Sequence, residues 1–488
     1  MFKVVSPKTM YAIDQMNLKK KSMTSYELMF QAAKACYDNM NKDLIFRNAK
    51  EIIIIYGKGH NGGDALLIGY ELIKRTSKVT LFTPYQQNEL NEDTLIALNK
   101  LKTLSNFEET LKINKHFDII IDGLFGIGYQ GKLEEHVERL ITKVNESRVP
   151  VFSIDIPSGL NANTGIIDQS SMIAYQTYVI QYLKYGNILN QAKDVHGDIK
   201  IVDAGIDSYS IHIDAYKLSG HFFKETLAKR KHYTHKYHYG KVLIYAYKAT
   251  MPGALNLATK AALRSGIGLV SYVSDNRYAL MNLNDEVIQI LSQNDMDLKR
   301  SLDRVDAVLF GPGLGREKHH QTSLIELLNK GIPLVIDGDG IAHLKGCIDF
   351  LPKTLPIVIT PHQGEWSNFF NQSNINQIEL LEKLHIFNEY DICWVLKGPA
   401  TLIHYKKETY IMDIAPSALA KAGSGDVLSG IITSLLGQGF SPLKAGLYGV
   451  YIHSLAALKA LEKETEETFI PSDMIQEFPQ VFRILNKD

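Results

Sequence analysis

The residues best suited to chemistry in this sequence are two glycines and an aspartate in its second half. Gly423, Gly425 and Asp426 stand directly before an apolar helical segment that begins near Val427. Amide hydrogens at the start of a helix, together with the helix dipole, bind phosphate groups. A carboxylate beside them can accept a proton from an attacking hydroxyl, as phosphoryl transfer requires. The motif therefore indicates phosphoryl transfer, although a glycine turn capped by an aspartate would also explain it.

Other loops in the second half carry further candidate binding residues, most of them directly after a predicted strand. They are Met251–Val270, Gly311–Gly315, Asp337–Leu344, Thr360–Trp366 and Leu396–Thr401. His362, within Pro-His-x-Gly-Glu, could be only a turn residue, and Lys397, at a strand end, could be only a solvated side chain. The position of Lys397 before Gly-Pro-Ala-Thr favours a contact with a nucleotide.

A second glycine-rich segment, in the first half, contains Gly57, Gly59 and Gly62 between a predicted strand and a predicted helix. This is the context of a dinucleotide-binding fingerprint. That fingerprint also needs an acidic residue at the end of the next strand. The next predicted strand is followed by Thr83, Pro84 and Tyr85 instead. An ordinary Rossmann dehydrogenase is therefore disfavoured.

Polar side chains accompany the ends of three predicted strands in the first half. Asn61 and Asp64 lie among the first glycines, Asp122 ends a later strand, and Asp155 and Ser158 follow another. In open α/β sheets, ligands bind at the carboxyl ends of the strands. We therefore expect Asn61, Asp122, Asp155 and Ser158 to converge on one crevice, although each alone could be a helix cap or turn former.

The elements that must position these residues are short β-branched strands that alternate with helices. This alternation predicts an α/β protein with parallel sheets covered on both faces. Ser6 and Pro7 predict the cap and first position of the first helix. The predicted strands are Ile52–Tyr56, Val79–Phe82, Asp118–Ile121, Val151–Ile154, Val179–Tyr182, Val242–Tyr245, Ala307–Phe310, Leu334–Ile336, Ile357–Ile359 and Ile392–Leu396, and the predicted helices include Ala65–Thr76 and Leu255–Ser265.

Length and charge narrow the class of protein. The 488 residues suffice for two or three domains, and a polar, basic and aromatic stretch at 208–240 predicts the boundary. His232, His235 and His238 recur there at every third position and could ligate a metal, but a solvated or nucleotide-facing connector is favoured because no carboxylate or cysteine joins them at ligand spacing. Equal numbers of basic and acidic residues, 53 of each, argue against nucleic-acid binding and polybasic membrane binding.

The cysteines and apolar segments indicate a compartment. Cys36, Cys347 and Cys393 are widely separated, which favours a reducing environment over a disulfide framework. We find no secretory signal pattern and no apolar run near the roughly 18 residues that span a bilayer. We therefore expect a cytoplasmic protein.

The three first-half loops, HNGGD, DGLFGIG and DIPSG, and the segment SMTSYELMFQAAKA resemble the epimerase domain of the NAD(P)H-hydrate repair family. The resemblance implies that Asn61, Asp122 and Ser158 hold a potassium ion, which hard oxygen ligands suit. It also implies that Asp155 performs acid–base chemistry at the epimerised carbon. The residues implied to contact the hydrated nicotinamide nucleotide are His60, Asn61, Gly62, Gly63, Asp64, Gly126, Ile127, Gly128, Tyr129, Gln130, Gly131, Lys132 and Asp155.

The second-half loops GPGLG, DGDGIAHL, PHQGEW, KGPAT and GSGD resemble the dehydratase domain of the same family, which has a ribokinase-like fold. The resemblance implies that Asp426 deprotonates a ring hydroxyl, which is phosphorylated and then eliminated as phosphate, a better leaving group than water. Mg²⁺ would bridge the nucleotide phosphates. The implied contacts with the hydrated dinucleotide are Ala254, Gly315, His362 and Asp426, and those with ADP or ATP are Lys397, Gly398, Pro399, Ala400, Thr401 and Gly425.

The sequence thus predicts an N-terminal Rossmann-like three-layer α/β/α domain, residues 1–215, and a ribokinase-like α/β domain, residues 222–482. The resemblance implies epimerisation of hydrated NADH and NADPH by the first and ADP-dependent dehydration of the S hydrate by the second. We also expect a homo-oligomer. Two alternatives remain: a small-molecule kinase fused to a Rossmann-like partner, and a first domain that only binds or scaffolds.

Overall fold

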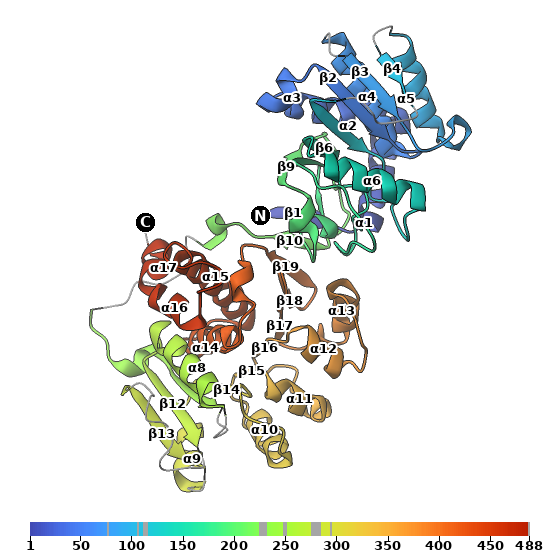
Figure 1. The fold of residues 1–488 in the computed structure, drawn as a ribbon. Helices are drawn as coiled ribbons and strands as arrows, with labels where there is room; N and C mark the ends of the chain where they lie inside the picture. Colours follow the sequence, from blue (N-terminus) through green and yellow to red (C-terminus); the bar gives the residue numbers. More distant parts are fainter. Residues whose placement is uncertain are drawn as a thin grey trace. The chain divides into compact units, whose positions relative to one another are not determined.

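The computed structural model describes residues 1–75, 78–104, 107–110, 116–223, 232–246, 251–274, 285–292 and 295–486. The chain forms two compact units, residues 2–216 and residues 217–488, and Met1 groups with the second (Figure 1). Within the predicted connector, residues 224–231 lie outside the described part. No helix in the described ranges is long and apolar enough to cross a membrane.

The unit formed by residues 2–216 is built on a parallel sheet with the order β4-β3-β2-β5-β6-β7-β9. Its strands are β2 (Glu51–Tyr56), β3 (Lys78–Phe82), β4 (Phe107–Glu109), β5 (Ile119–Gly123), β6 (Val151–Ile154), β7 (Gln176–Ile180) and β9 (Asp198–Val202). A separate parallel pair joins β1 (Phe2–Val5) to β8 (Leu183–Lys184). The helices are α1 (Pro7–Lys21), α2 (Ser25–Met40), α3 (Leu44–Asn48), α4 (His60–Lys74), α5 (Glu92–Lys102), α6 (Glu135–Ser147) and α7 (Ala192–Val195).

The isoleucines of β2 show how this unit forms three layers. Ile52 and Ile54 pack into the core that α2 and α4 share. Ile53 and Ile55 point to the opposite face, where they pack against Val137 and other residues of α6. Alternate residues of a strand face opposite sides of the sheet, so an all-apolar strand must be covered on both sides. The predicted α/β/α layering is confirmed.

The first helix begins where the sequence predicts. The Ser6 hydroxyl accepts a hydrogen bond from the Thr9 amide at 3.1 Å, and Pro7 occupies the first helical turn. Several other boundaries differ from prediction, and two of the differences bear on the candidate site. Helix α4 begins at His60 rather than Ala65, so the Asn61–Asp64 segment forms its first turn. The predicted bounds of the strand at Val179–Tyr182 are wrong. Strand β7 ends at Ile180, and Gln181 takes a left-handed conformation with φ of 60°.

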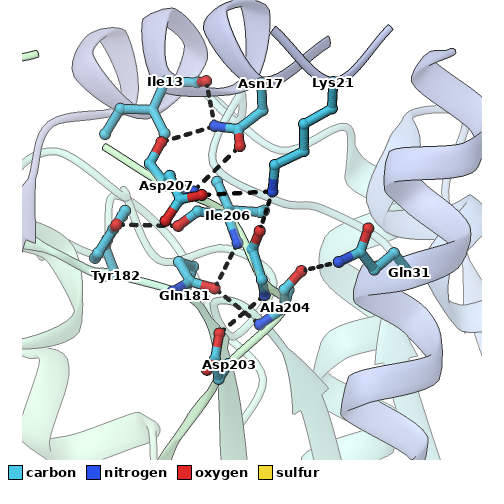
Figure 2. A network of polar contacts seen from close by, with 11 residues as sticks. Ile13, Asn17, Lys21, Gln31, Gln181, Tyr182, Asp203, Ala204, Ile206 and Asp207 are labelled. Carbon is cyan, nitrogen blue, oxygen red and sulfur yellow. Dashed lines mark hydrogen bonds and ion pairs between the residues drawn. The ribbon is translucent and has the colours of Figure 1, made fainter. Parts of the chain in front are cut away.

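A polar network anchors α1 to the loop that follows β9 (Figure 2). Asn17, which is fully buried, donates to the Asp207 carbonyl oxygen at 2.8 Å and accepts from the Asp207 amide at 3.1 Å. The Gln181 side-chain oxygen accepts from the amides of Ala204 and Ile206 in the same loop. Both backbone groups of Asp207 are thereby satisfied by one side chain, which fixes the loop against the helix.

The unit formed by residues 217–488 contains strands in the order β13-β12-β11-β14-β15-β16-β17-β18-β19. The pairs from β13 to β17 are parallel, and the last two pairs are antiparallel. The strands are β11 (Lys241–Tyr245), β12 (Leu269–Ser274), β13 (Val287–Leu291), β14 (Ala307–Phe310), β15 (Leu334–Ile336), β16 (Ile357–Ile359), β17 (Ile392–Leu396), β18 (Thr401–Tyr405) and β19 (Glu408–Met412), while β10 (Ala215–Lys217) spans the boundary between the units.

Helices cover both faces of these strands. Figure 1 shows α8, α14, α15, α16 and α17 on one face and α10, α11, α12 and α13 on the other. The helices are α8 (Pro252–Arg264), α9 (Asp295–Leu302), α10 (Lys318–Lys330), α11 (Asp339–Lys345), α12 (Gln363–Phe369), α13 (Gln377–Leu384), α14 (Ser424–Gly437), α15 (Pro442–Ala460), α16 (Pro471–Gln476) and α17 (Phe478–Leu485). The largest core lies among α8, α14 and α15, where α14 is apolar and almost entirely buried.

Candidate active sites

The unit of residues 2–216 contains a cavity of about 610 Å³. Its walls come from α1, α2, the start of α4, and the loops that follow β5 and β6. Predicted substrate-binding residues that line it are His60, Asn61, Asp64, Gly126, Ile127, Gly128, Tyr129, Gln130 and Asp155. The lining does not include Gly62, Gly63, Gly131 or Lys132, so the cavity brings most of the predicted set together but not all of it.

Asp155 stands directly after β6 in a left-handed conformation, with φ of 62°. Residues with a Cβ rarely adopt this conformation, so surrounding contacts must hold it. Asp155 Oδ1 accepts from the Ile180 amide at 3.0 Å and from Lys184 Nζ at 2.5 Å. The Asn187 side chain donates to the Asp155 carbonyl oxygen at 3.1 Å. The carboxylate therefore has a fixed position at the cavity wall.

Lys184 was not predicted from sequence, yet it is the most deeply buried charge of this cavity. Its side chain is 0% exposed and lies against Asp155, and Nζ also donates to the Ile180 carbonyl oxygen at 3.1 Å. A buried ammonium is stable only when it is paired and hydrogen-bonded. Lys184 therefore orients the Asp155 carboxylate and holds its Oδ1 atom in place.

Two further carboxyl groups, those of Asp14 and Asp64, line the same cavity. Each has a buried Oδ1 atom with no hydrogen-bond partner. Burial raises the pKa of Asp14 to about 7, although Lys184 opposes the shift and Asp155 adds to it. Burial also raises the pKa of Asp64 well above its usual range, and Asp155 adds to that shift. Three carboxyl groups thus share the cavity with one buried lysine.

Asn61, Asp122 and Ser158, the predicted cation ligands, form one cluster beside the cavity. The Ser158 hydroxyl donates to Asp122 Oδ1 at 2.5 Å and accepts from the Phe125 amide at 2.8 Å. Asn61 donates to the Phe125 carbonyl oxygen at 2.6 Å. Asp122 and Ser158 are fully buried, and burial raises the pKa of Asp122 despite its bonds to Ser158. The cluster supplies carboxylate, hydroxyl and carbonyl oxygens, a donor set that fits a hard monovalent cation.

A second group of candidate residues lies in the other unit, at the carboxyl ends of adjacent parallel strands. The loop of Gly311–Gly315 follows β14, Asp337 follows β15, and Lys397 follows β17. His362 precedes α12 as its N-cap and follows β16 by a short turn. In open parallel sheets this edge is where ligands bind. These loops therefore lie at one edge of the sheet.

Lys397 is the centre of an ionic cluster at this edge. Its Nζ atom lies 2.9 Å from Asp337 Oδ1 and 4.0 Å from Glu365 Oε2. Burial opposes its charge, but the Asp337 and Glu365 carboxylates more than offset that effect and raise the pKa of Lys397. Burial and Asp337 raise the pKa of Asp426 to about 7, against the effect of Lys397. Asp426 therefore titrates near neutral pH, as suits a general base.

The first turn of α14 borders this cluster. Gly423 is its N-cap with φ of 94° and makes no side-chain cap, so the turn's amides have no side-chain acceptor there. A Cβ atom added to Gly425 would lie 3.2 Å from Lys397 Nζ. Glycine therefore leaves open the space between the helix start and the lysine, where an anion would meet amide hydrogens, a helix dipole and an ammonium.

The remaining predicted residues of this unit divide into two sets. A Cβ atom on Gly313 would lie 3.0 Å from Ala254, so the loop after β14 borders the first turn of α8. The Gly315 carbonyl oxygen accepts from His343 Nε2 at 2.9 Å, and the Gly315 amide donates to Asp339 Oδ2 at 2.8 Å, which ties Gly315 to α11. In the nucleotide set, Gly398 and Pro399 are exposed, whereas Ala400 and Thr401 are buried.

The sequence analysis did not identify Lys184 or Asp14, and it assigned no role to Asp337 or Glu365. Signals for two of them exist. Asp337 and Glu365 lie in loops that the sequence singled out. Lys184 had none, because nothing local distinguishes a buried lysine. Among the described residues, which include His232, His235 and His238, no group of three His, Cys, Asp or Glu side chains is arranged to hold a metal ion.

Two family models match the chain. Residues 25–186 match "YjeF-related protein N-terminus", and residues 242–480 match "NAD(P)H-hydrate dehydratase". Among solved structures, a ribokinase-like superfamily protein from Enterococcus faecalis matches with a TM-score of 0.50 and 24% identity, over 56% of this chain and 98% of that one. Fold and site together define a two-unit α/β enzyme whose second unit has the ribokinase-like fold.

Similar proteins cover nearly the whole chain. A "Bifunctional NAD(P)H-hydrate repair enzyme Nnr" from Escherichia coli is 31% identical over 89% of this chain and 85% of its own. Those of Moorella thermoacetica and Coxiella burnetii are 27% and 29% identical and cover 99% and 96% of this chain, and 97% and 96% of their own. The chain belongs to the bifunctional NAD(P)H-hydrate repair enzyme family. The family predicted from the motifs is confirmed.

Proposed function

We propose that this chain repairs hydrated NADH and NADPH in two reactions. The unit of residues 2–216 interconverts the R and S hydrates, and the unit of residues 217–488 dehydrates the S hydrate at the expense of ADP or ATP. The observation that carries the proposal is the presence of two separate candidate acid–base centres. In the first unit, Asp155 is hydrogen-bonded to Lys184 in a cavity. In the second unit, Asp426 lies at the start of a helix without a side-chain cap, near Lys397.

In the first reaction, Asp155 accepts and donates a proton during epimerisation of the carbon that bears the hydroxyl group. The left-handed backbone and the bonds from Ile180 and Lys184 fix one carboxylate oxygen, Oδ1. The other oxygen is the one that would meet substrate. The glycines of the Gly126–Gly128 segment at the cavity wall let the hydrated ring approach the backbone.

A potassium ion is proposed for the cluster of Asn61, Asp122 and Ser158. The donor set supports the assignment, and the positive charge of the ion would balance the negative charge of the buried Asp122 carboxylate. Its role would be to hold the Gly126–Gly128 segment and the start of α4 in place, since Phe125 is bonded to two members of the cluster. Proton movement is assigned to the chain's own groups.

In the second reaction, Asp426 accepts the proton of the ring hydroxyl. The hydroxyl oxygen then forms a bond to the terminal phosphorus of the nucleotide, whose bridging P–O bond breaks. Amides at the start of α14 and Lys397 Nζ stabilise the transferred phosphoryl group. Phosphate subsequently leaves with the electrons of the C–O bond while the neighbouring carbon loses a proton, which restores the ring double bond.

Mg²⁺ is proposed to accompany the nucleotide. Asp337 and Glu365 could hold it, because both carboxylates lie at the Lys397 cluster and hard oxygen ligands suit this ion. When bound, it would neutralise charge on the phosphates. The preference for ADP, the contacts of Gly398 and Pro399 with the nucleotide, and assembly as a homo-oligomer remain predictions. The three cysteines are buried and unpaired, which supports a reducing compartment such as the cytoplasm.

Separate assays of the two reactions on the full chain test the proposal. Purified R hydrate, without nucleotide, is followed by chiral chromatography for conversion to S hydrate. S hydrate with ADP or ATP is then followed by the recovery of NADH absorbance. A stable phosphorylated product in place of NADH would identify a small-molecule kinase instead. Full epimerisation by Asp155→Asn would indicate that Asp155 has no acid–base role.

A further inference from the structure

Helix α1 brings an unexplained acid into the epimerase cavity. Asp14 lines the cavity, its Oδ1 is buried, and that atom has no hydrogen-bond partner. A buried polar atom without a partner costs free energy, roughly 1–3 kcal/mol for a neutral group. An apolar side chain at position 14, like those of Met10 and Ile13 on the same helix, would not have this cost. The atom is therefore available to a ligand in the cavity.

The helix that carries Asp14 is anchored by hydrogen bonds on either side of the next turn. One turn further along α1, Asn17 is locked to Asp207 by two hydrogen bonds and to Ile13 by a third at 2.8 Å (Figure 2). Lys21 donates to the Gly205 carbonyl oxygen of the same loop. Helix α1 is thus a rigid wall of the cavity, and Asp14 faces the space that Asp155 also faces.

We propose that Asp14 is a second catalytic residue of epimerisation, which protonates the departing hydroxyl while Asp155 deprotonates the incoming water. This inference rests on the proposed epimerase function. Asp14 comes from α1 and Asp155 from the turn after β6, so the two groups approach one bound ring from different elements.

The chemistry of the hydrate supplies the rest of the step. Water adds to a ring enamine at the carbon attached to nitrogen, so the epimerised carbon bears both a hydroxyl and the nitrogen. Asp14 gives its proton to that hydroxyl, the C–O bond breaks with its electrons on the departing water, and the nitrogen lone pair forms a planar iminium cation. A second water adds to the other face, and Asp155 takes its surplus proton. Return of one proton from Asp155 to Asp14 through cavity water resets the enzyme.

The charges of the cavity suit a cationic intermediate. Asp14, Asp64 and Asp155 share it with a single buried cation, Lys184. The two acid–base carboxyls also differ in environment, as paired catalytic carboxyls must. Asp155 is ion-paired with Lys184, whereas Asp14 has no bonded partner at Oδ1, and burial raises its pKa to about 7. Asp14 is therefore substantially protonated at neutral pH, while Asp155 is the base.

An isotope experiment on the unaltered full-length protein tests the step. R hydrate is incubated in ¹⁸O-labelled water without nucleotide, and the S product is analysed by mass spectrometry, with the spontaneous rate subtracted. We expect one ¹⁸O atom for each inversion. Inversion without ¹⁸O would overturn the proposal, because the original C–O bond would have survived. Failure of the protein to epimerise at all would instead refute the proposed function.

The variant Asp14→Asn keeps the shape of the side chain but cannot donate this proton. We expect the epimerisation rate to fall roughly 10²–10⁴-fold, the usual contribution of a general acid. Asp38→Asn, which removes an exposed carboxylate paired with Lys34 on α2, is the matched control and should keep the rate. An unchanged rate for Asp14→Asn would overturn the proposal. If that variant unfolds, the isotope result on the unaltered protein still decides.

The pH profile separates a proton donor from a structural residue. The groups around Asp14 are Lys184 on β8, Asp155 after β6 and Asp64 on α4, and the other titratable residues of the cavity are Tyr11, Lys58, His60 and Tyr129. The rate of the unaltered protein should decline as pH rises through about 7, where Asp14 loses its proton. Asp14→Asn should lack that decline in its residual rate, and a decline that persisted there would contradict the assignment.

Discussion

Lys184 Nζ lies 2.5 Å from Asp155 Oδ1, and the lysine side chain is completely excluded from solvent. The two residues are 29 positions apart and reach each other only because β6 and β8 bring their chain ends together. Taking an ammonium out of water is expensive unless a paired charge compensates it. The pair therefore couples the stability of the first unit to the position of the Asp155 carboxylate, for which we propose a catalytic role.

Substitution Lys184→Met should show both effects. Removal of one partner leaves the Asp155 charge uncompensated, which typically costs about 3–5 kcal/mol. We expect a lower free energy of unfolding for this unit, measured by denaturant titration, and loss of epimerase activity under conditions where the unit is folded. Lys34→Met, which removes an exposed ion pair with Asp38, should change stability by less than about 1 kcal/mol. Equal effects of the two substitutions would show that the buried pair is unimportant.

The dehydratase reaction should depend on the ionisation of Asp426. Because burial raises its pKa to about 7, the carboxylate that acts as base is lost as pH falls through that value. The rate of NADH recovery at saturating nucleotide should therefore rise from pH 5 to a plateau above about 7. Asp426→Asn should lower kcat roughly 10²–10⁴-fold. Asp349→Asn, at an exposed position, is the control, and a pH profile unaltered by Asp426→Asn would exclude this residue as the base.

Gly425 should be intolerant of a side chain for a local reason. A Cβ atom there would lie 3.2 Å from Lys397 Nζ, in the space proposed for the phosphate. Gly425→Val should raise KM for the nucleotide at least roughly tenfold, which corresponds to about 1.4 kcal/mol of lost binding. Epimerase activity of the same preparation serves as the internal control, since its residues lie in the other unit. An unchanged KM would place the phosphate elsewhere.

Asn17 should be important for stability although it meets no substrate. Asn17→Ala removes three hydrogen bonds and leaves the partly buried amide and carbonyl of Asp207 without that partner. We therefore expect Asn17→Ala to lower the free energy of unfolding by about 2–4 kcal/mol. Asn39→Ala, which removes a bond to the Ala35 carbonyl on α2 and an exposed bond from Lys42, should cost about 1 kcal/mol or less. Thermal or denaturant unfolding of both variants, compared with the unaltered chain, checks the difference.

The strands were predictable because each buried strand is a run of consecutive apolar residues. Val151–Ile154, Ala307–Phe310 and Ile392–Leu396 occur at their predicted bounds. The strand expected at Val179–Tyr182 was displaced because apolar character continues past Gln181, whereas the left-handed backbone at that residue ends β7. Apolarity shows where a chain is buried, but a local conformation with positive φ decides where a strand stops.

The candidate sites were predictable only as far as their loops were. Asp155 and Asp426 could be found because glycines and strand ends mark their surroundings. Lys184 could not, since its role arises from a contact between β8 and the turn after β6 that no local pattern encodes. Asp14 was missed because a single acid on a helix normally faces solvent. Only the packing of α1 against the cavity shows that it faces inward.

Helix α1 ends at Lys21, four residues before the segment that matches the first family model begins at Ser25. A gene fragment trimmed to that match would retain every glycine motif of the first unit, yet it would discard Met10, Tyr11, Asp14 and Leu18 from the cavity wall. Such a fragment would expose the apolar surface beneath the missing helix to water. Expression trials of the first unit alone should therefore include β1 and α1 and extend through Tyr216.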